Sequence, residues 1–406
     1  SSTFNFNFGQ RAFSYTPPTG FNKLSSSDSI PTPPSVVRPQ RFFDIILYTG
    51  TDTSANRTIS GLEFSPDFVW QKRRNGTNWH GLHDTVRGGG KSLYSNSTST
   101  EATNNQYGYI SAFTSDGFTW SAGSTNNSDG NETNGTFVAW CWKAGGNSNT
   151  FNIDGTGYAT AAAAGLDGGS LDPTGASINT ESGFSILTYT GTGNVSETIA
   201  HGLGKKPAWI IVKSRNIDGQ DWIIYNKNLD GGNEPETHTL KLNSTGEEQD
   251  LNDVWYDTEP TSSVFTIGNE YMVNGNSTST YVAYCWAEIP DFSKFGSYTG
   301  NSSDDGTFVY LGFRPAWLMV KRANGSSTNW TILDNKRDTS NVAETRLFAN
   351  SDSADSVSAG GVGSVDFLSN GFKARDSHQD GNSSSGTYVY MAFAEQPGTT
   401  SFDTIS

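Results

Sequence analysis

The stretch GKKPAWIIVK (residues 204–213) has two further copies in this chain of 406 residues, FRPAWLMVK (313–321) and SPDFVWQK (65–72). In each copy, a Pro is followed after one spacer by an aromatic residue, a short apolar run, and a Lys six residues after the Pro. Three copies of one stretch predict three copies of one folding unit.

Each repeat also has a recognisable beginning and end. An apolar run ending in Tyr-Thr-Gly opens it, and an aromatic-rich segment closes it 94, 97 and 95 residues after the opening Tyr. The opening and closing residues are Tyr48 and Trp142, Tyr189 and Trp286, and Tyr298 and Phe393. We expect the opening and closing segments of each repeat to pair as neighbouring strands.

The central stretch is apolar on both faces of a strand. In the second copy, Trp209 and Ile211 share one face and Ile210 and Val212 share the other. Such a strand is buried on both sides or covered by long loops. With 45 Gly, only 17% charged residues and few helix formers, the chain is predicted to be all-β. We expect three tandem antiparallel β-sandwich or jelly-roll-like modules with an extended N-terminal arm.

The repeats divide the chain into five parts. Residues 1–40 hold a strand with alternating Phe and a Pro/Ser-rich linker, which either ends a preceding domain or is donated to a neighbour. Repeats one, two and three are predicted at 41–146, 183–290 and 291–406, the last including a C-terminal tail. Residues 147–182 form an inter-repeat hairpin and linker that turns at Asp154–Gly155. We expect repeats two and three, joined by few residues, to be the more rigid pair.

Charge and cysteine content exclude several classes of partner. The net charge of −15 argues against nucleic acid and anionic membranes, which both require clustered Lys and Arg. No apolar run reaches the ~20 residues of a spanning helix, so no membrane insertion is expected. Cys141 and Cys285 occupy the place of Ala392 in repeat three, which predicts two free buried cysteines and no metal site.

The residues that recur in all three repeats are interpreted as structural. Lys72, Lys213 and Lys321 are expected to pack their stems and to reach solvent with the ammonium group. Three tryptophans follow them, Trp79, Trp222 and Trp330, and are expected to lie in the core.

A ligand site is therefore sought where the repeats disagree. Trp120 and Trp255 have no aromatic counterpart in the other repeats, and Trp255 is followed by Tyr256 in a polar loop. Because the flat face of an aromatic ring stacks on a sugar ring, these three residues are the candidates for ligand contact.

The chain shows no catalytic signature on which to base an activity. His83–Asp84 resembles part of a hydrolase triad, but no nucleophile in an elbow accompanies it. The acidic pairs Asp304–Asp305 and Glu247–Glu248 lie in turns, which is weak support for glycosidase chemistry. Acidic turns such as Asp230–Gly231–Gly232 lack the regular ligand spacing of a calcium loop. We predict no catalytic residue, no metal and no cofactor.

The opening, central and closing segments together resemble a repeat that is common in structural proteins of marine bacteriophages. In those proteins the repeats often follow a lectin-like domain of the SPRY or concanavalin type, whose last strand is similar to residues 6–11. The resemblance covers nearly the whole chain. It implies a virion protein, a tail fibre or related surface appendage that contacts a host-surface glycan. The implied partners are further copies of the chain, for example in a trimer, and other virion proteins.

Two alternatives stay open. A capsid decoration or fibre-forming subunit would use residues 4–8 to complete a sheet in another chain. A polysaccharide-degrading enzyme would need acids clustered in one cleft.

Overall fold

The structure is a computed structural model that describes residues 36, 38–52, 54–357 and 363–395. Strands hold 40% of the residues and helices 5%, and the sheets are antiparallel and sandwich-like, so the predicted all-β class is confirmed. The predicted N-terminal strand and the end of the C-terminal tail lie outside the described residues.

Module 1 follows a short 3-10 helix, η1 (Pro39–Arg41), and consists of two sheets. In sheet order, the large one contains β1 (Phe43–Thr49), β9 (Thr136–Trp142), β3 (Phe68–Arg73), β4 (Gly81–Asp84), β5 (Lys91–Tyr94) and β6 (Ala102–Thr103). The small one contains β2 (Arg57–Ser60), β8 (Gly117–Ser121) and β7 (Tyr109–Thr114).

Module 3 repeats this plan strand for strand. Its large sheet contains β21 (Ser293–Thr299), β29 (Thr387–Ala394), β23 (Pro315–Arg322), β24 (Thr331–Asp334), β25 (Thr345–Phe348) and β26 (Ser356–Val357). Its small sheet contains β22 (Phe308–Tyr310), β28 (Gly371–Ala374) and β27 (Val365–Leu368).

Module 2 has the same large sheet, extended by strands from the segment that precedes it. The repeated part contains β13 (Phe184–Thr190), β20 (Thr280–Trp286), β15 (Trp209–Ser214), β16 (Ile223–Asn226), β17 (His238–Lys241) and β18 (Gln249–Asp250). Strands β14 (Glu197–Ala200) and β19 (Val264–Ile267) form the small sheet. The short helices are η2 (Leu229–Gly232), η3 (Pro235–Thr237), α1 (Asn252–Trp255) and α2 (Tyr271–Asn274).

The segment expected to link repeats one and two is built into module 2. Strands β10 (Phe151–Ile153) and β11 (Thr156–Tyr158) form the hairpin that turns at Asp154–Gly155. Strand β12 (Gly175–Asn179) pairs with both β10 and β13, the opening strand of module 2. This part of 147–182 is therefore the edge of a sheet and not a flexible connection.

The expected pairing of opening and closing segments is confirmed in every module. Strand β1 pairs with β9, β13 with β20, and β21 with β29. In each pair the opening Tyr stacks on an aromatic ring of the closing strand, with centroids 5.0 Å apart. These pairs are Tyr48 with Phe137, Tyr189 with Tyr281, and Tyr298 with Tyr388.

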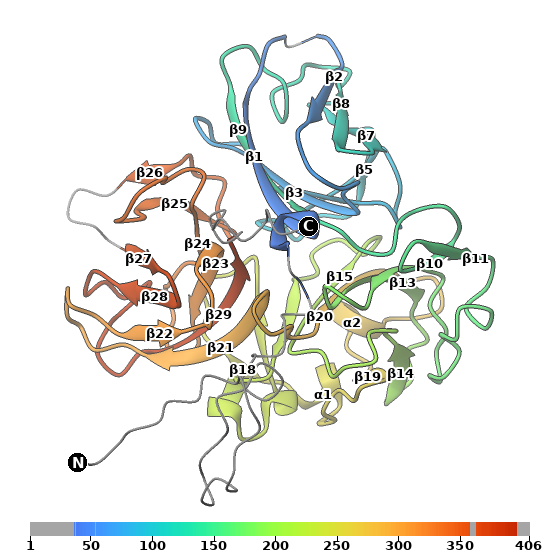
Figure 1. The fold of residues 1–406 in the computed structure, drawn as a ribbon. Helices are drawn as coiled ribbons and strands as arrows, with labels where there is room; N and C mark the ends of the chain where they lie inside the picture. The colour runs from blue at the N-terminus through green and yellow to red at the C-terminus, as the bar shows by residue number, and fades with distance from the viewer. Residues whose placement is uncertain (1–35, 37, 53, 358–362, 396–406) are drawn as a thin grey trace, which may run out of the picture.

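The three modules surround a common core (Figure 1). The central strands show why. In β15, Ile210 and Val212 pack inside module 2, whereas Trp209 and Ile211 belong to a cluster that contains residues of all three modules. We call this cluster the common core. Both faces of each large sheet are thereby buried, which explains the doubly apolar central stretch.

Free cysteines lie between the two sheets of their own modules. Cys141 and Cys285 are buried and unpaired with each other, as predicted, and Ala392 takes the same place in module 3. Burial raises the pKa of both thiols.

The modules meet in a cyclic order, and we name the contacts junctions 1–2, 2–3 and 3–1. At junction 1–2 the Trp222 indole N–H donates to the Tyr94 carbonyl at 2.8 Å. At junction 2–3 the Trp330 indole N–H donates to the Lys241 carbonyl at 3.0 Å. Since Tyr94 and Lys241 hold the same position in β5 and β17, modules 2 and 3 each contact the preceding module in the same way.

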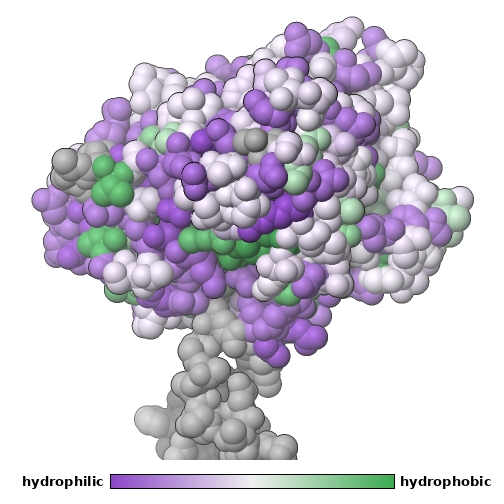
Figure 2. Space-filling view, turned by 90° about the horizontal axis from the view of Figure 1, so that it is seen from above, coloured by the Kyte–Doolittle hydropathy of each residue, from purple (hydrophilic) through white to green (hydrophobic). Residues whose placement is uncertain are grey.

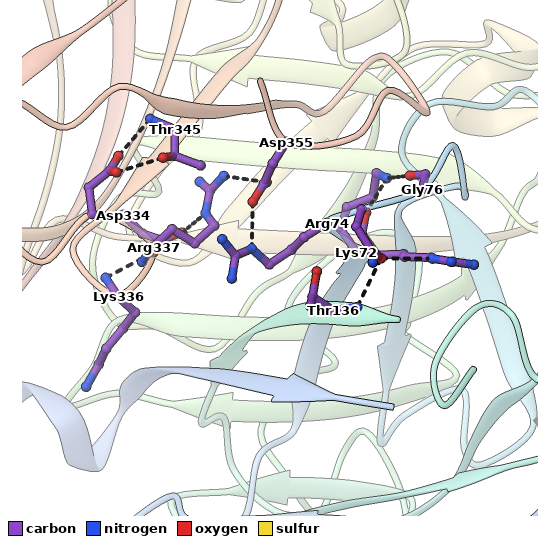
Figure 3. A network of polar contacts seen from close by, with 12 residues as sticks. Lys72, Arg74, Gly76, Thr136, Asp334, Lys336, Arg337, Thr345 and Asp355 are labelled. Carbon is purple, nitrogen blue, oxygen red and sulfur yellow. Dashed lines mark hydrogen bonds and ion pairs between the residues drawn. The ribbon is translucent and has the colours of Figure 1, made fainter. Parts of the chain in front are cut away.

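A partly buried ion pair crosses junction 3–1 and contacts a fully buried pair within module 3 (Figure 3). Arg74 of module 1 contacts Asp355 of module 3 at 2.6 Å, and Asp355 also contacts Arg337 at 3.2 Å. Arg337 binds Asp334, which accepts a bond from the Trp140 indole N–H at 3.0 Å. At junction 1–2 the same positions are filled by Asp84, Arg87, Glu101, Arg215 and Tyr284.

The repeated Lys residues are part of these junctions, contrary to expectation. Lys72, Lys213 and Lys321 are buried. Lys213 donates to the Thr98 carbonyl across junction 1–2, and Lys321 points to the Thr245 carbonyl across junction 2–3. Burial lowers the pKa of each to about 8. Their ammonium groups donate to main-chain carbonyls and, for Lys321, also to the Thr328 hydroxyl at 2.7 Å, and not to solvent.

Most of the apolar side chains in the described residues lie in the module cores or in the common core. The face shown in Figure 2 is mainly polar, and hydrophobic residues appear on it as small patches. Within the described ranges, no helix is long and apolar enough to cross a membrane.

Candidate ligand-binding site

Strand register shows that Trp79 is not the counterpart of Trp222 and Trp330. The backbone N–H of Trp222 donates to Asn243 and that of Trp330 to Asn350. In module 1 the residue with this bond is His80, whose N–H donates to Asn96. His80 lies in the common core region, accepts a hydrogen bond from the Trp70 indole N–H at 3.0 Å, and is fully buried. Trp79 is displaced by one residue and faces outward.

Trp79 forms one wall of a pocket on module 1. Its side chain is 45% exposed and meets the ring of Tyr94 edge-on, with centroids 5.0 Å apart. Tyr107, 39% exposed, adds a third aromatic ring to the lining. The cavity holds about 690 Å³, a size typical of small-molecule sites. The lining residues are Thr77, Asn78, Trp79, Tyr94, Ser99, Thr100, Ala102, Thr103, Asn104, Asn105, Gln106, Tyr107, Ser128 and Asp129.

We call this cavity the Trp79 pocket. Its aromatic wall is absent at the equivalent position of module 2. There, Asp221 and Lys241 replace Trp79 and Tyr94, and they form an ion pair at 2.9 Å. The same backbone frame thus carries an aromatic pair in one module and a charged pair in the next.

Polar groups surround the aromatic wall, and most of them are amides and hydroxyls. Of the described residues that line the pocket, Asp129 alone carries a charge. Asn78 donates to its carboxylate at 2.9 Å, and burial raises the pKa of Asp129 to about 6. Burial also raises the pKa of Tyr94 to about 12, so its hydroxyl stays protonated at neutral pH.

Comparison with known proteins places the chain in a family. Residues 38–397 match a model described as a domain of unknown function (DUF7483). The chain belongs to the DUF7483 family. Because the match includes all three modules, the family unit is the whole three-module assembly. No curated protein and no solved structure matches the chain significantly.

In this DUF7483 protein, Trp120 supports the pocket from behind and does not face a ligand. The side chain is buried, and its indole N–H donates to Asn127. A Cβ atom at Gly130 would lie 2.0 Å from the ring, and one at Gly108 would lie 2.5 Å from its nitrogen. The loops that carry Tyr107 and Asp129 therefore rest on Trp120. The candidate was wrong as a stacking surface because β8 turns this side chain into the sandwich.

Trp255 is also buried, so the prediction that it contacts a ligand was wrong. It ends helix α1 and meets the Tyr225 ring edge-on, with centroids 6.0 Å apart. Tyr256 follows in the left-handed conformation with φ 52° and is 40% exposed. The two rings point in different directions, so they do not form one surface. The polar character of the surrounding loop did not reveal that a one-turn helix directs Trp255 inward.

The sequence held one signal for Trp79. The Lys-to-Trp spacing is seven residues in repeat one and nine in the other two, whereas Lys72 to His80 is eight. The loop before β4 is thus one residue shorter than its counterparts, and the usual Trp position falls on His80. A His in a Trp position and an extra Trp beside it mark the place where repeat one departs from the others.

Proposed function

We propose that this DUF7483 protein is a virion structural protein, a tail-fibre-like surface appendage, that binds a neutral glycan of the host surface in the Trp79 pocket. The observation that carries the binding part is the aromatic wall of the pocket, in which Trp79 and Tyr107 are exposed and Tyr94 lies buried behind them, surrounded by amides and hydroxyls. Aromatic faces stack on the C–H faces of sugars, and amides exchange hydrogen bonds with sugar hydroxyls. The virion part rests on the resemblance of the repeats.

The lining also favours a neutral ligand and binding without cleavage. It contains no Lys, Arg or His among the described residues, so it offers no countercharge to an acidic sugar. Glycosidases of the common kind need two carboxyl groups across the bond, and among the described lining residues this pocket presents one, Asp129. The alternative, a capsid decoration, places the protein on the head of the particle instead of the tail. Imaging of particles that carry a label on this chain would distinguish the two locations.

Replacement of Trp79 tests the proposed site. Trp79→Ala should weaken binding to an array of neutral oligosaccharides of glucose, galactose and mannose by roughly thirtyfold in Kd or more, because truncation of a central Trp costs about 2 kcal/mol or more. Tyr310→Ala is the matched control, since Tyr310 is 61% exposed on module 3, away from the pocket. Equal binding by the Trp79 variant and the wild type would refute the site.

A further inference from the structure

One wall of the Trp79 pocket contacts another module. Residues 99–103, except Glu101, line the pocket. Within module 1 this wall is held by β6, a strand of only two residues that pairs with β5 through Lys91–Thr103 and Ser92–Ala102. So short a ladder is a weak anchor. Glu101 also contacts Arg87 at 3.3 Å and Lys91 at 3.8 Å.

Module 2 forms hydrogen bonds to this wall at two points across junction 1–2. The Lys213 ammonium donates to the Thr98 carbonyl at 3.2 Å. The Glu101 backbone N–H donates to the Arg215 carbonyl at 2.7 Å, and the Arg215 guanidinium makes two bonds to the Glu101 carboxylate at 2.9 and 3.0 Å. Ser99 and Thr100 lie between the two anchors, so their place in the pocket is set by module 2.

We propose that Lys213 and Arg215 are positioning residues for the Trp79 pocket, so that the ligand site of module 1 is complete only when module 2 is docked. The proposal rests on the function proposed above. A bidentate guanidinium–carboxylate pair fixes direction as well as distance. Binding is tighter when the wall is already ordered, because the ligand does not have to order it.

The cyclic repeat supplies matched controls. Arg74 makes the equivalent contacts at junction 3–1, where its carbonyl accepts from the Asp355 N–H and its side chain pairs with Asp355. Arg74 and Arg215 are similarly buried, with 24% and 22% of the side chain exposed. Lys321 likewise matches Lys213, with its contact to Thr245. Neither control residue borders the Trp79 pocket.

The test compares Arg215→Ala with Arg74→Ala in the full chain. Hydrogen–deuterium exchange of residues 98–107 should speed up in the Arg215 variant and stay unchanged in the Arg74 variant. Binding to the array of neutral oligosaccharides should weaken roughly tenfold, equivalent to about 1.4 kcal/mol, for Arg215→Ala only. Arg215→Lys, which keeps the charge, should recover part of the loss. If Arg215→Ala does not fold, Lys213→Met and its control Lys321→Met replace the pair.

Each outcome decides one point. Unchanged exchange of residues 98–107 in the Arg215 or Lys213 variant overturns the positioning role, whether or not a glycan binds. Loss of binding in Trp79→Ala but not in Arg215→Ala overturns the positioning role and leaves the proposed function standing. Equal binding by Trp79→Ala and the wild type removes the proposed function instead.

Discussion

At the residue scale, one pair of core side chains shows size compensation among the three modules. Trp70 packs with His80 in module 1. The corresponding positions hold Ile211 and Trp222 in module 2 and Met319 and Trp330 in module 3, and all four of these side chains belong to the common core. A large residue at one position accompanies a smaller one at the other. Close-packed interiors require this, since they contain few voids larger than a water molecule.

The compensation predicts a non-additive double mutant. His80→Trp alone should overpack the core beside Trp70 and destabilise the protein by about 1–3 kcal/mol. Trp70→Met alone should leave a cavity, unpair the His80 ring nitrogen and cost at least about 2 kcal/mol. The double variant, which copies module 3, should be more stable than either single variant in urea unfolding. A double variant whose loss equals the sum of the two would contradict the pairing.

At the element scale, the loops of the Trp79 pocket depend on β8. This strand places Trp120 beneath the segments around Gly108 and Gly130, and the absence of a Cβ there lets both segments approach the ring. Sequence comparison identified Trp120 as a residue without counterpart, which is correct. The strand alternation that turns it inward is what makes it a support.

Gly130→Ala tests this support. The added methyl group would lie 2.0 Å from the Trp120 ring, so the loop that carries Asp129 must move, at a cost of about 1–3 kcal/mol. Thermal unfolding and glycan-array binding should both decrease. Gly168→Ala is the control, because a Cβ at Gly168 meets no atom within 4 Å; it should change neither measurement.

At the scale of the whole molecule, two junctions contain a buried Asp–Arg pair and one does not. Junctions 1–2 and 3–1 each contain a buried Asp–Arg pair and a second Arg from the neighbouring module. At junction 2–3 the equivalent positions hold Asn226, Leu229 and Ala323, and the last two belong to the common core. The buried Asp and both Arg residues are absent there together, as expected if removal of a single partner leaves a costly buried charge. The third acidic position is still filled, by Glu248, whose carboxylate accepts a hydrogen bond from the Asp230 backbone N–H.

The buried Asp and the two Arg residues occur together or not at all, and this predicts how junction 3–1 responds to mutation. Asp334→Asn alone should destabilise the protein by about 3 kcal/mol, because Arg337 stays buried without its main partner. The triple variant with Arg337→Leu and Arg74→Ala, which copies junction 2–3, should lose less than the single variant in urea unfolding. Asn226→Asp places a buried carboxylate where junction 2–3 offers no Arg partner, because Leu229 and Ala323 fill the Arg positions, and should be as harmful as Asp334→Asn. A triple variant less stable than the single one would refute the claim that these three residues depend on one another.

The sequence by itself determined the elements that depend on pattern within one repeat. The three copies, the pairing of opening and closing strands, the strand buried on both faces and the interchange of Cys141 with Ala392 all follow from apolar alternation and internal comparison. These features depend on contacts within one repeat, and the same contacts recur between corresponding strands in every copy.

Only the tertiary structure decided what covers the second face of each large sheet. An apolar face is satisfied equally by a loop, another chain or a neighbouring module, because burial of apolar surface has no direction. The structure shows that the three modules cover one another around the common core. It also decided that His80 and not Trp79 is buried in module 1. The loop before β4 is one residue shorter there, so His80 takes the core position and Trp79 stays at the surface.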